Sequence, residues 1–178
     1  MTTEQRTGHP ISKRAAIVRR AILLIGSVGP LGHLPASGTV TVAALGIPVF
    51  WWFSEFHEQE LWQVMIVLAF AGASMCLHHV GDQLLSEQDS RQLVWDELAG
   101  FLAAIVFLPF TWQLAVIAIL LERALDVLKP PPANWIDRSW HGGVGVVADD
   151  LVAGAYTCVL LHVTIWAAPT WVGINPAA

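Results

Sequence analysis

This chain has little charge: Asp, Glu, Lys and Arg together make up 13% of its 178 residues. That fraction is about half the value of an average soluble domain. Residues 98–121 and 151–178 contain none of these four residue types. Uncharged runs of roughly 18 residues or more are typical of helices that cross a membrane. The scarcity of charge therefore indicates an integral membrane protein, with a large apolar-cored helical domain as the alternative. The net charge of −5 argues against nucleic acid as a partner.

Cysteine is scarce as well, and this excludes two further classes. The two cysteines, Cys76 and Cys158, lie alone in apolar segments, and no Cys-x-x-Cys spacing occurs. A disulfide framework and a thiolate metal site both need more cysteines at closer spacing. Both residues are therefore predicted to be small buried hydrophobic groups.

The apolar segments predict an all-α fold. Residues 13–25 suit an amphipathic helix with a basic face, whereas residues 26–38 are too rich in Gly and Pro for a continuous helix. Residues 61–81 and 149–168 are long enough to span a bilayer, while residues 26–53 can cross or re-enter. We expect a polytopic helical membrane protein with a re-entrant or hairpin helix pair, in which residues 13–178 form one domain and residues 1–12 a disordered tail.

The prediction of a hairpin helix pair depends on one interruption of an uncharged run. The uncharged run at residues 98–121 is broken by Pro109-Phe110-Thr111, which favours a turn between helical arms at residues 93–108 and 112–128. If that pair enters and leaves from one face, all nine Lys and Arg fall on the same side of the membrane. The excess of basic residues on cytoplasmic segments then places that side, with most of the acids discussed below, in the cytoplasm.

Half of the fourteen carboxylates cluster at the ends of the uncharged runs. Two adjacent pairs, Asp96-Glu97 and Asp149-Asp150, are each expected to open a helix. Acids in a first helical turn often serve only to complement the helix dipole. Two such pairs beside apolar segments are better explained by a divalent metal, because Mg²⁺ prefers carboxylate oxygens together with water and substrate phosphate. The four acids are therefore predicted metal ligands.

Cations and further polar groups accompany these acids. Arg123 can clamp a phosphate with Asp126 as a metal ligand or its orienter, or the two can form a simple intrahelical ion pair. Lys129 follows one turn later. The remaining candidates lie on a predicted short helix and on a glycine-rich turn: Asp137, Arg138, His141, and Thr39 of Ser37-Gly38-Thr39. A solvated surface helix and simple turn formation explain these nearly as well. His78 and His79 end an apolar segment and are expected to be interfacial or packed rather than ligands.

Three runs of sequence resemble one known family, the phosphatidylglycerophosphatase A family. They are Val94-Trp95-Asp96-Glu97-Leu98-Ala99-Gly100, Arg123-Ala124-Leu125-Asp126-Val127-Leu128-Lys129-Pro130, and Asp137-Arg138 through His141-Gly142-Gly143-Val144-Gly145 to Asp149-Asp150-Leu151-Val152-Ala153-Gly154. The resemblance covers residues 89–154 well and the earlier half more loosely. The run at Ser37-Gly38-Thr39 lacks a Pro of the family pattern, and Glu122 is not part of that pattern.

The resemblance implies a Mg²⁺-dependent phosphatase of the bacterial inner membrane, which removes the terminal phosphate of phosphatidylglycerophosphate at the cytoplasmic face. On this hypothesis Asp96, Glu97, Asp149 and Asp150 hold metal, and Arg123, Lys129, Arg138 and Thr39 bind the phosphate. Asp126 or Asp137 acts as base or orienter, and His141 protonates the leaving oxygen. A covalent aspartyl-phosphate route stays open.

Two alternatives to this reaction remain. One is a phosphatase of another lipid phosphate, and the other is a non-enzymatic cation-binding membrane transporter. A transporter would place acids along a path at mid-membrane, whereas these acids lie at segment ends. The chain has neither the Asp-x-Asp-x-(Thr/Val) start of haloacid-dehalogenase-type phosphatases nor the Lys/Arg and Ser-Gly-His pattern of vanadium-type lipid phosphatases.

Overall fold

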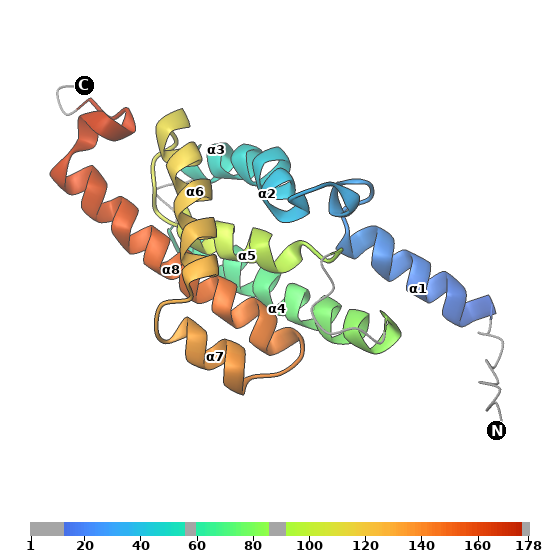
Figure 1. Cartoon of the computed structure of the whole chain (residues 1–178). Helices are drawn as coiled ribbons and strands as arrows, with labels where there is room; N and C mark the ends of the chain where they lie inside the picture. The colour runs from blue at the N-terminus through green and yellow to red at the C-terminus, as the bar shows by residue number, and fades with distance from the viewer. Residues whose placement is uncertain (1–12, 56–59, 86–91, 176–178) are drawn as a thin grey trace.

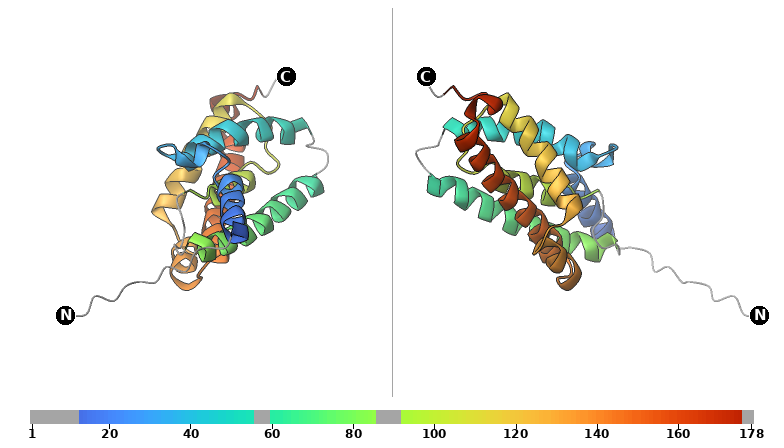
Figure 2. Two further views of the ribbon diagram at one scale, coloured as in Figure 1. Left: turned by 90° about the vertical axis from the view of Figure 1, so that its right-hand side faces the viewer. Right: turned by 60° about the vertical axis from the view of Figure 1, so that its left-hand side comes forward.

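Helices make up all the regular structure in the part of the chain that the computed structural model describes, residues 13–55, 60–85 and 92–175 (Figures 1 and 2). The predicted all-α class is thereby confirmed, while the expected tail at residues 1–12 lies outside the described residues. The elements are α1 (Lys13–Gly26), η1 (Leu31–His33), α2 (Ser37–Thr41), the π-helical turn η2 (Val42–Gly46), α3 (Ile47–Glu55), α4 (Glu60–Leu85), α5 (Trp95–Ala104), α6 (Trp112–Leu128), α7 (Ala133–Ser139), α8 (Gly143–Ala167) and η3 (Pro169–Val172).

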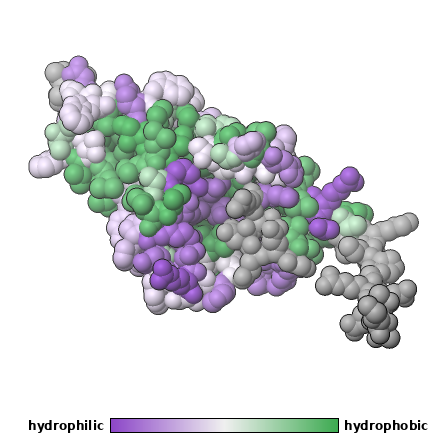
Figure 3. All heavy atoms as spheres, viewed as in Figure 1, coloured by the Kyte–Doolittle hydropathy of each residue, from purple (hydrophilic) through white to green (hydrophobic). Residues whose placement is uncertain are grey.

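Three helical stretches within the described residues are long and apolar enough to cross a membrane: Ser37–Glu55, Leu61–Leu85 and Gly143–Ala167. The first joins α2, η2 and α3 without a break, which gives about 28 Å of helix at 1.5 Å per residue. The other two correspond to the segments that the sequence predicts as spans. Figure 3 shows apolar residues over the region of α6 and the C-terminal part of α8, whereas polar residues gather around α7.

The last helix begins earlier than predicted, at Gly143, so Asp149 and Asp150 do not open it but lie about two turns inside. The cause is a close approach between helices. A Cβ on Gly143 would stand 2.2 Å from the carbonyl oxygen of Met75 on α4. Glycine at this position is therefore a packing requirement, and the contact with α4 compensates for the poor helix propensity of glycine, about 1 kcal/mol relative to alanine.

The predicted turn between two helices at Pro109-Phe110-Thr111 is present, but α5 ends at Ala104 instead of residue 108. Phe107 takes a left-handed conformation with φ of +64°, and its backbone N–H donates to Oε1 of the buried Gln63 at 2.8 Å. That side chain supplies the partner that a continuing helix would have provided. Thr111 then caps α6, since its hydroxyl oxygen accepts from the backbone N–H of Leu114 at 3.0 Å.

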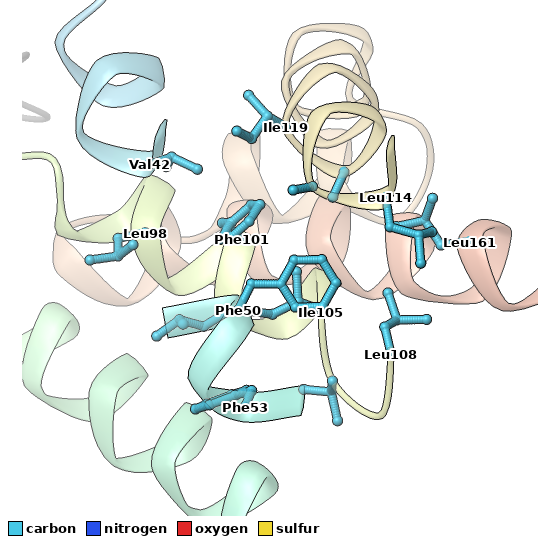
Figure 4. Packing of buried hydrophobic residues seen from close by; sticks show 14 of the residues in the cluster. Val42, Phe50, Phe53, Leu98, Phe101, Ile105, Leu108, Leu114, Ile119 and Leu161 are labelled. Atoms are coloured by element: carbon cyan, nitrogen blue, oxygen red, sulfur yellow. The ribbon is translucent and has the colours of Figure 1, made fainter. Parts of the chain in front are cut away.

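The main core lies between α3, α5, α6 and α8 (Figure 4). Its largest fully buried side chains are Phe50, Phe53, Phe101, Ile105, Leu108, Leu114 and Leu161. In a membrane such side chains stabilise the fold chiefly through van der Waals packing between helices, because lipid tails are as apolar as the side chains themselves. The core fixes α5 from its C-terminal half, so that its first turn, with Asp96 and Glu97, lies at the edge of the apolar region.

Glycines set the distance between α5 and α8. A Cβ on Gly154 would stand 2.1 Å from the carbonyl oxygen of Gly100, and one on Gly100 would stand 2.8 Å from that of Asp150. Backbones in such close contact leave no room for a side chain at either position. The contact brings the first turn of α5 next to the acids of α8.

Candidate active site

One cavity of about 950 Å³ receives side chains from six α-helices, α2, α4, α5, α6, α7 and α8. Its lining includes all four predicted metal ligands, Asp96, Glu97, Asp149 and Asp150, together with Thr39, Asp126, Lys129, Asp137 and His141. Segments more than 100 residues apart in the chain, from Thr39 on α2 to Asp150 on α8, therefore meet at one place. The structure brings these residues together, and their individual roles stay predictions.

Asp96 is buried in the first turn of α5, with 7% of its surface exposed. Its Oδ1 lies 3.4 Å from Nε2 of His78, a histidine on α4 that has no exposed surface. The expectation that His78 packs is consistent with its burial, but its neighbour is a site carboxylate. A histidine at this place can hold Asp96 in one orientation.

Glu97 lies between an arginine and a glycine. Its Oε1 accepts from the Arg123 guanidinium at 2.9 Å, and its Oε2 lies where a Cβ on Gly38 would be, at 1.3 Å. Burial, reinforced by the neighbouring charge of Asp96 and opposed by Arg123, raises the pKa of Glu97 to about 7. Near neutral pH this carboxyl group therefore exchanges between its protonated and ionised forms.

The two acids of α8 line the cavity with different closest partners. The Asp150 carboxyl is buried, with 4% of the residue exposed, and lies near the carboxyl groups of Asp126, Asp96 and Glu122. Asp149 instead accepts a hydrogen bond from Lys129 Nζ at 2.5 Å. Like charges at such short range repel each other in a medium of low dielectric constant. The Asp150 side of the cavity therefore favours a bound cation.

Lys129 carries the positive charge on the other side. It caps the C-terminus of α6 in a left-handed conformation with φ of 44°, and its ammonium group also donates to Asp137 at 2.5 Å. These two carboxylates raise the pKa of Lys129 above its ordinary value, although partial burial acts to lower it. The ammonium group is thus charged and held in the cavity between α7 and α8.

Arg123 and Arg138 do not line the cavity. The Arg123 guanidinium donates to both oxygens of Glu122, at 2.8 and 2.9 Å, and to Glu97. Phosphate binding by Arg123 would require one of these contacts to open, so this role stays a prediction. Arg138 lies exposed on α7. His141 is exposed at the cavity wall just before α8. Thr39 is the third residue of α2.

The sequence did not predict that His78 and Glu122 are buried next to the site. Both are completely buried, and both contact site groups, Asp96 and Arg123 respectively. A charged residue next to a long uncharged run is a usable signal in the case of Glu122. For His78 the sequence has no such signal, because its contact with α5 depends on the packing of α4.

The carboxylate oxygens of the cavity are ligands of the kind that a hard divalent cation prefers. Oε2 of Glu97 and Oδ1 of Asp96 are buried, and neither accepts a hydrogen bond from the residues described here. Unsatisfied carboxylate oxygens at a cavity wall are suitable ligands for Mg²⁺. Within residues 13–55, 60–85 and 92–175, however, no three His, Cys, Asp or Glu side chains already surround one point as a metal would require. A bound ion would have to draw them together.

A buried set of acids, a fixed lysine and candidate membrane helices together fit a phosphomonoesterase that works at a membrane. Comparison with known proteins gives the family. The chain belongs to the phosphatidylglycerophosphatase A family, whose model matches residues 24–165. The resemblance noted in the three sequence runs is thereby confirmed, and the chain is assigned to the phosphomonoesterases.

Three relatives illustrate the match. Phosphatidylglycerophosphatase A of Escherichia coli (strain K12) is 32% identical over 124 residues, which cover 68% of this chain and 71% of the relative. The Haemophilus influenzae protein of the same name is 26% identical over 166 residues, or 86% and 93% of the two chains. A Bacteroides thetaiotaomicron protein named "Putative phosphatidylinositol-3-phosphatase" is 34% identical over 152 residues, or 81% and 93%. No solved structure matches the chain.

Proposed function

We propose that this protein hydrolyses phosphatidylglycerophosphate to phosphatidylglycerol and phosphate in a Mg²⁺-dependent reaction of phospholipid biosynthesis. The observation that carries the proposal is the meeting of Asp96, Glu97, Asp149 and Asp150 with Lys129 in one cavity of a chain of this family. Acids that hold a divalent cation, beside a fixed ammonium group, suit a phosphate monoester dianion. The names of the relatives from Escherichia coli and Haemophilus influenzae support the choice of substrate.

The chain's own residues bind and orient the phosphate. Asp96, Glu97, Asp149 and Asp150 would hold Mg²⁺, which when bound neutralises phosphate charge and makes water more acidic. Lys129 would neutralise a further phosphate oxygen after leaving Asp137 or Asp149. Thr39, which lines the cavity from α2, would donate its hydroxyl to the phosphate. Arg138 would reach the substrate only from outside the cavity, because its side chain lies exposed on α7.

Proton transfer is the role proposed for three further residues of the cavity lining. Asp126 or Asp137 would take a proton from the attacking water or orient it, and His141 would protonate the glycerol oxygen as it leaves. Positioned acid–base groups contribute about 10²- to 10⁴-fold to such reactions. Asp137 and His141 are both exposed at the cavity wall. They can therefore exchange protons with bulk water between turnovers.

We further propose that residues 13–178 form one domain in the bacterial inner membrane, with the cavity at the cytoplasmic face. The start of α5 and the end of α6 both reach the cavity, through Asp96 and Lys129. A helix pair that enters and leaves from one face would produce this arrangement. The substrate's phosphate could then enter the cavity while its acyl chains stay in the bilayer.

The first experiment compares phosphate release by the purified, detergent-solubilised protein from three lipids, each with Mg²⁺ and with excess EDTA. The lipids are phosphatidylglycerophosphate, phosphatidic acid and phosphatidylinositol 3-phosphate. We expect release only from the first lipid and only with Mg²⁺. Release chiefly from the third would favour the activity named for the Bacteroides thetaiotaomicron relative. No release from any of them by folded protein would contradict the proposal and favour the transporter alternative.

A further inference from the structure

Glu122 is a buried carboxylate that the motifs of the site do not explain. It lies on α6 with no exposed surface. Burial of an ionised carboxylate costs several kcal/mol unless a cation and hydrogen bonds compensate. Its partner is Arg123, whose Nε and one terminal nitrogen donate to the two carboxylate oxygens at 2.8 and 2.9 Å.

Because Nε and one terminal nitrogen of Arg123 bind Glu122, the other terminal nitrogen is left to bind the carboxylates of the site. Adjacent residues of a helix do not normally face each other, so the guanidinium of Arg123 must fold back to reach Glu122. The second terminal nitrogen then points to the site, where it lies 2.9 Å from Oε1 of Glu97 and 3.4 Å from Oδ2 of Asp126. Both of these carboxylates line the cavity, whereas Arg123 lies behind them.

Glu122 packs closely against the backbone of α5 at Gly100. A Cβ on Gly100 of α5 would stand 2.8 Å from Oε1 of Glu122, so the carboxylate occupies the space that a side chain at residue 100 would fill. Glu97 is held on its far side by the backbone at Gly38. A continuous line of contacts thus runs from α6 across α5 to α2, through Glu122, Arg123, Glu97 and Gly38.

We propose that Glu122 is a positioning residue, which locks Arg123 so that this arginine holds the site carboxylates Glu97 and Asp126 in place instead of binding phosphate. The inference rests on the proposed metal-dependent phosphatase function. Two hydrogen bonds from one rigid guanidinium fork determine its orientation, which a lysine could not reproduce. Glu122 acts through Arg123 and touches neither metal nor substrate.

The test compares Glu122→Gln, Arg123→Gln and the double variant. We expect Glu122→Gln to lower kcat and to raise the Mg²⁺ concentration for half-maximal activity, each by about 10- to 100-fold, as for other residues that orient metal ligands. KM for phosphatidylglycerophosphate should change by less than about twofold. In the double variant kcat should be close to that of Arg123→Gln alone, because the hydrogen bonds that Glu122 accepts in the described structure both come from Arg123.

A binding measurement separates this inference from the proposed reaction. Mg²⁺ should raise the Tm of the wild-type protein, and this rise should be reduced in Glu122→Gln whichever lipid is the substrate. Thr157→Val is the matched control, since Thr157 is buried on α8 and, among the described residues, its hydroxyl bonds only the carbonyl of Ala153 in its own helix. The control should lower Tm without changing the response to Mg²⁺.

Two results with Glu122→Gln would overturn the inference, and a third would do so with the double variant. The first is a Glu122→Gln variant that behaves like Thr157→Val, with lower Tm but unchanged kcat and Mg²⁺ response. The second is a rise in KM at constant kcat, which would indicate that the pair faces the substrate. If Glu122→Gln does not fold, the double variant is compared with Arg123→Gln. Equal kcat values then support the inference, and a further loss of about tenfold or more overturns it.

Discussion

Gly154 of α8 lies against Gly100 of α5, so closely that a Cβ on Gly154 would stand 2.1 Å from the Gly100 carbonyl oxygen. This contact sets the spacing between Asp96-Glu97 and Asp149-Asp150, which lie within about one turn of it on the two helices. The distance between the two acid pairs therefore depends on two residues that carry no functional group.

Replacing Gly154 with alanine should push α5 away from α8. We expect a loss of about 1–3 kcal/mol in unfolding free energy from overpacking, and a fall in kcat as the acid pairs separate. Phosphate release and thermal unfolding in detergent measure the two effects. Gly72→Ala is the control, because nothing lies within 4 Å of a Cβ there and the exposed position on α4 should gain helix propensity. Wild-type kcat in Gly154→Ala would show that the spacing does not matter.

Asp96→Asn and Asp150→Asn test the metal ligands. Each change keeps the shape of the side chain and removes a charge from a set of mutually repelling acids. We expect turnover to fall below detection, because neutral amides bind Mg²⁺ poorly. Tm without metal should be unchanged or higher, since repulsion is relieved, whereas the rise in Tm on adding Mg²⁺ should be lost. Near-normal activity in both variants would contradict the assignment.

Lys129→Gln tests the cationic side of the cavity. The substitution removes the ammonium group that joins Asp137 to Asp149. We expect kcat/KM to fall about 10²-fold or more, because a charge-assisted contact to phosphate is lost. Lys129→Arg keeps the charge and should retain part of the activity. If both variants lose activity equally, the shape of the α6 terminus and not the charge of Lys129 controls turnover.

Glu97 makes the stability of the metal-free protein depend on pH. Because folding raises the pKa of Glu97 from 4.5 to about 7, the folded state binds its proton more tightly than the unfolded state does. Its contribution to stability is complete below pH 4.5 and is lost as the pH rises to about 7. In excess EDTA, the Tm difference between wild type and Glu97→Gln should change across this range and level off above it. A constant difference at every pH would refute the assigned shift.

The acids of the site could be predicted from the sequence because ionisable groups beside uncharged runs are costly to retain. Asp96 and Asp150 are therefore conspicuous without any structure. The start of α8 could not be predicted, since Gly143 reads as a loop signal until its contact with Met75 on α4 is known. Of the partners of Arg123, i, i+3 spacing indicates Asp126, whose Oδ2 lies 3.4 Å from the guanidinium, but it does not reveal the folded-back contact with Glu122.

The two halves of the acid cluster are separated by the whole of α6 and α7 in the chain. During synthesis, Asp96 and Glu97 are made first, and the acids that complete the site arrive only with α8. A nascent chain that stops before Gly143 therefore lacks Asp149 and Asp150, and also the helix against which α5 packs. On the proposed function, activity therefore depends on the last long helix, and a chain that ends before Gly143 should release no phosphate from lipid.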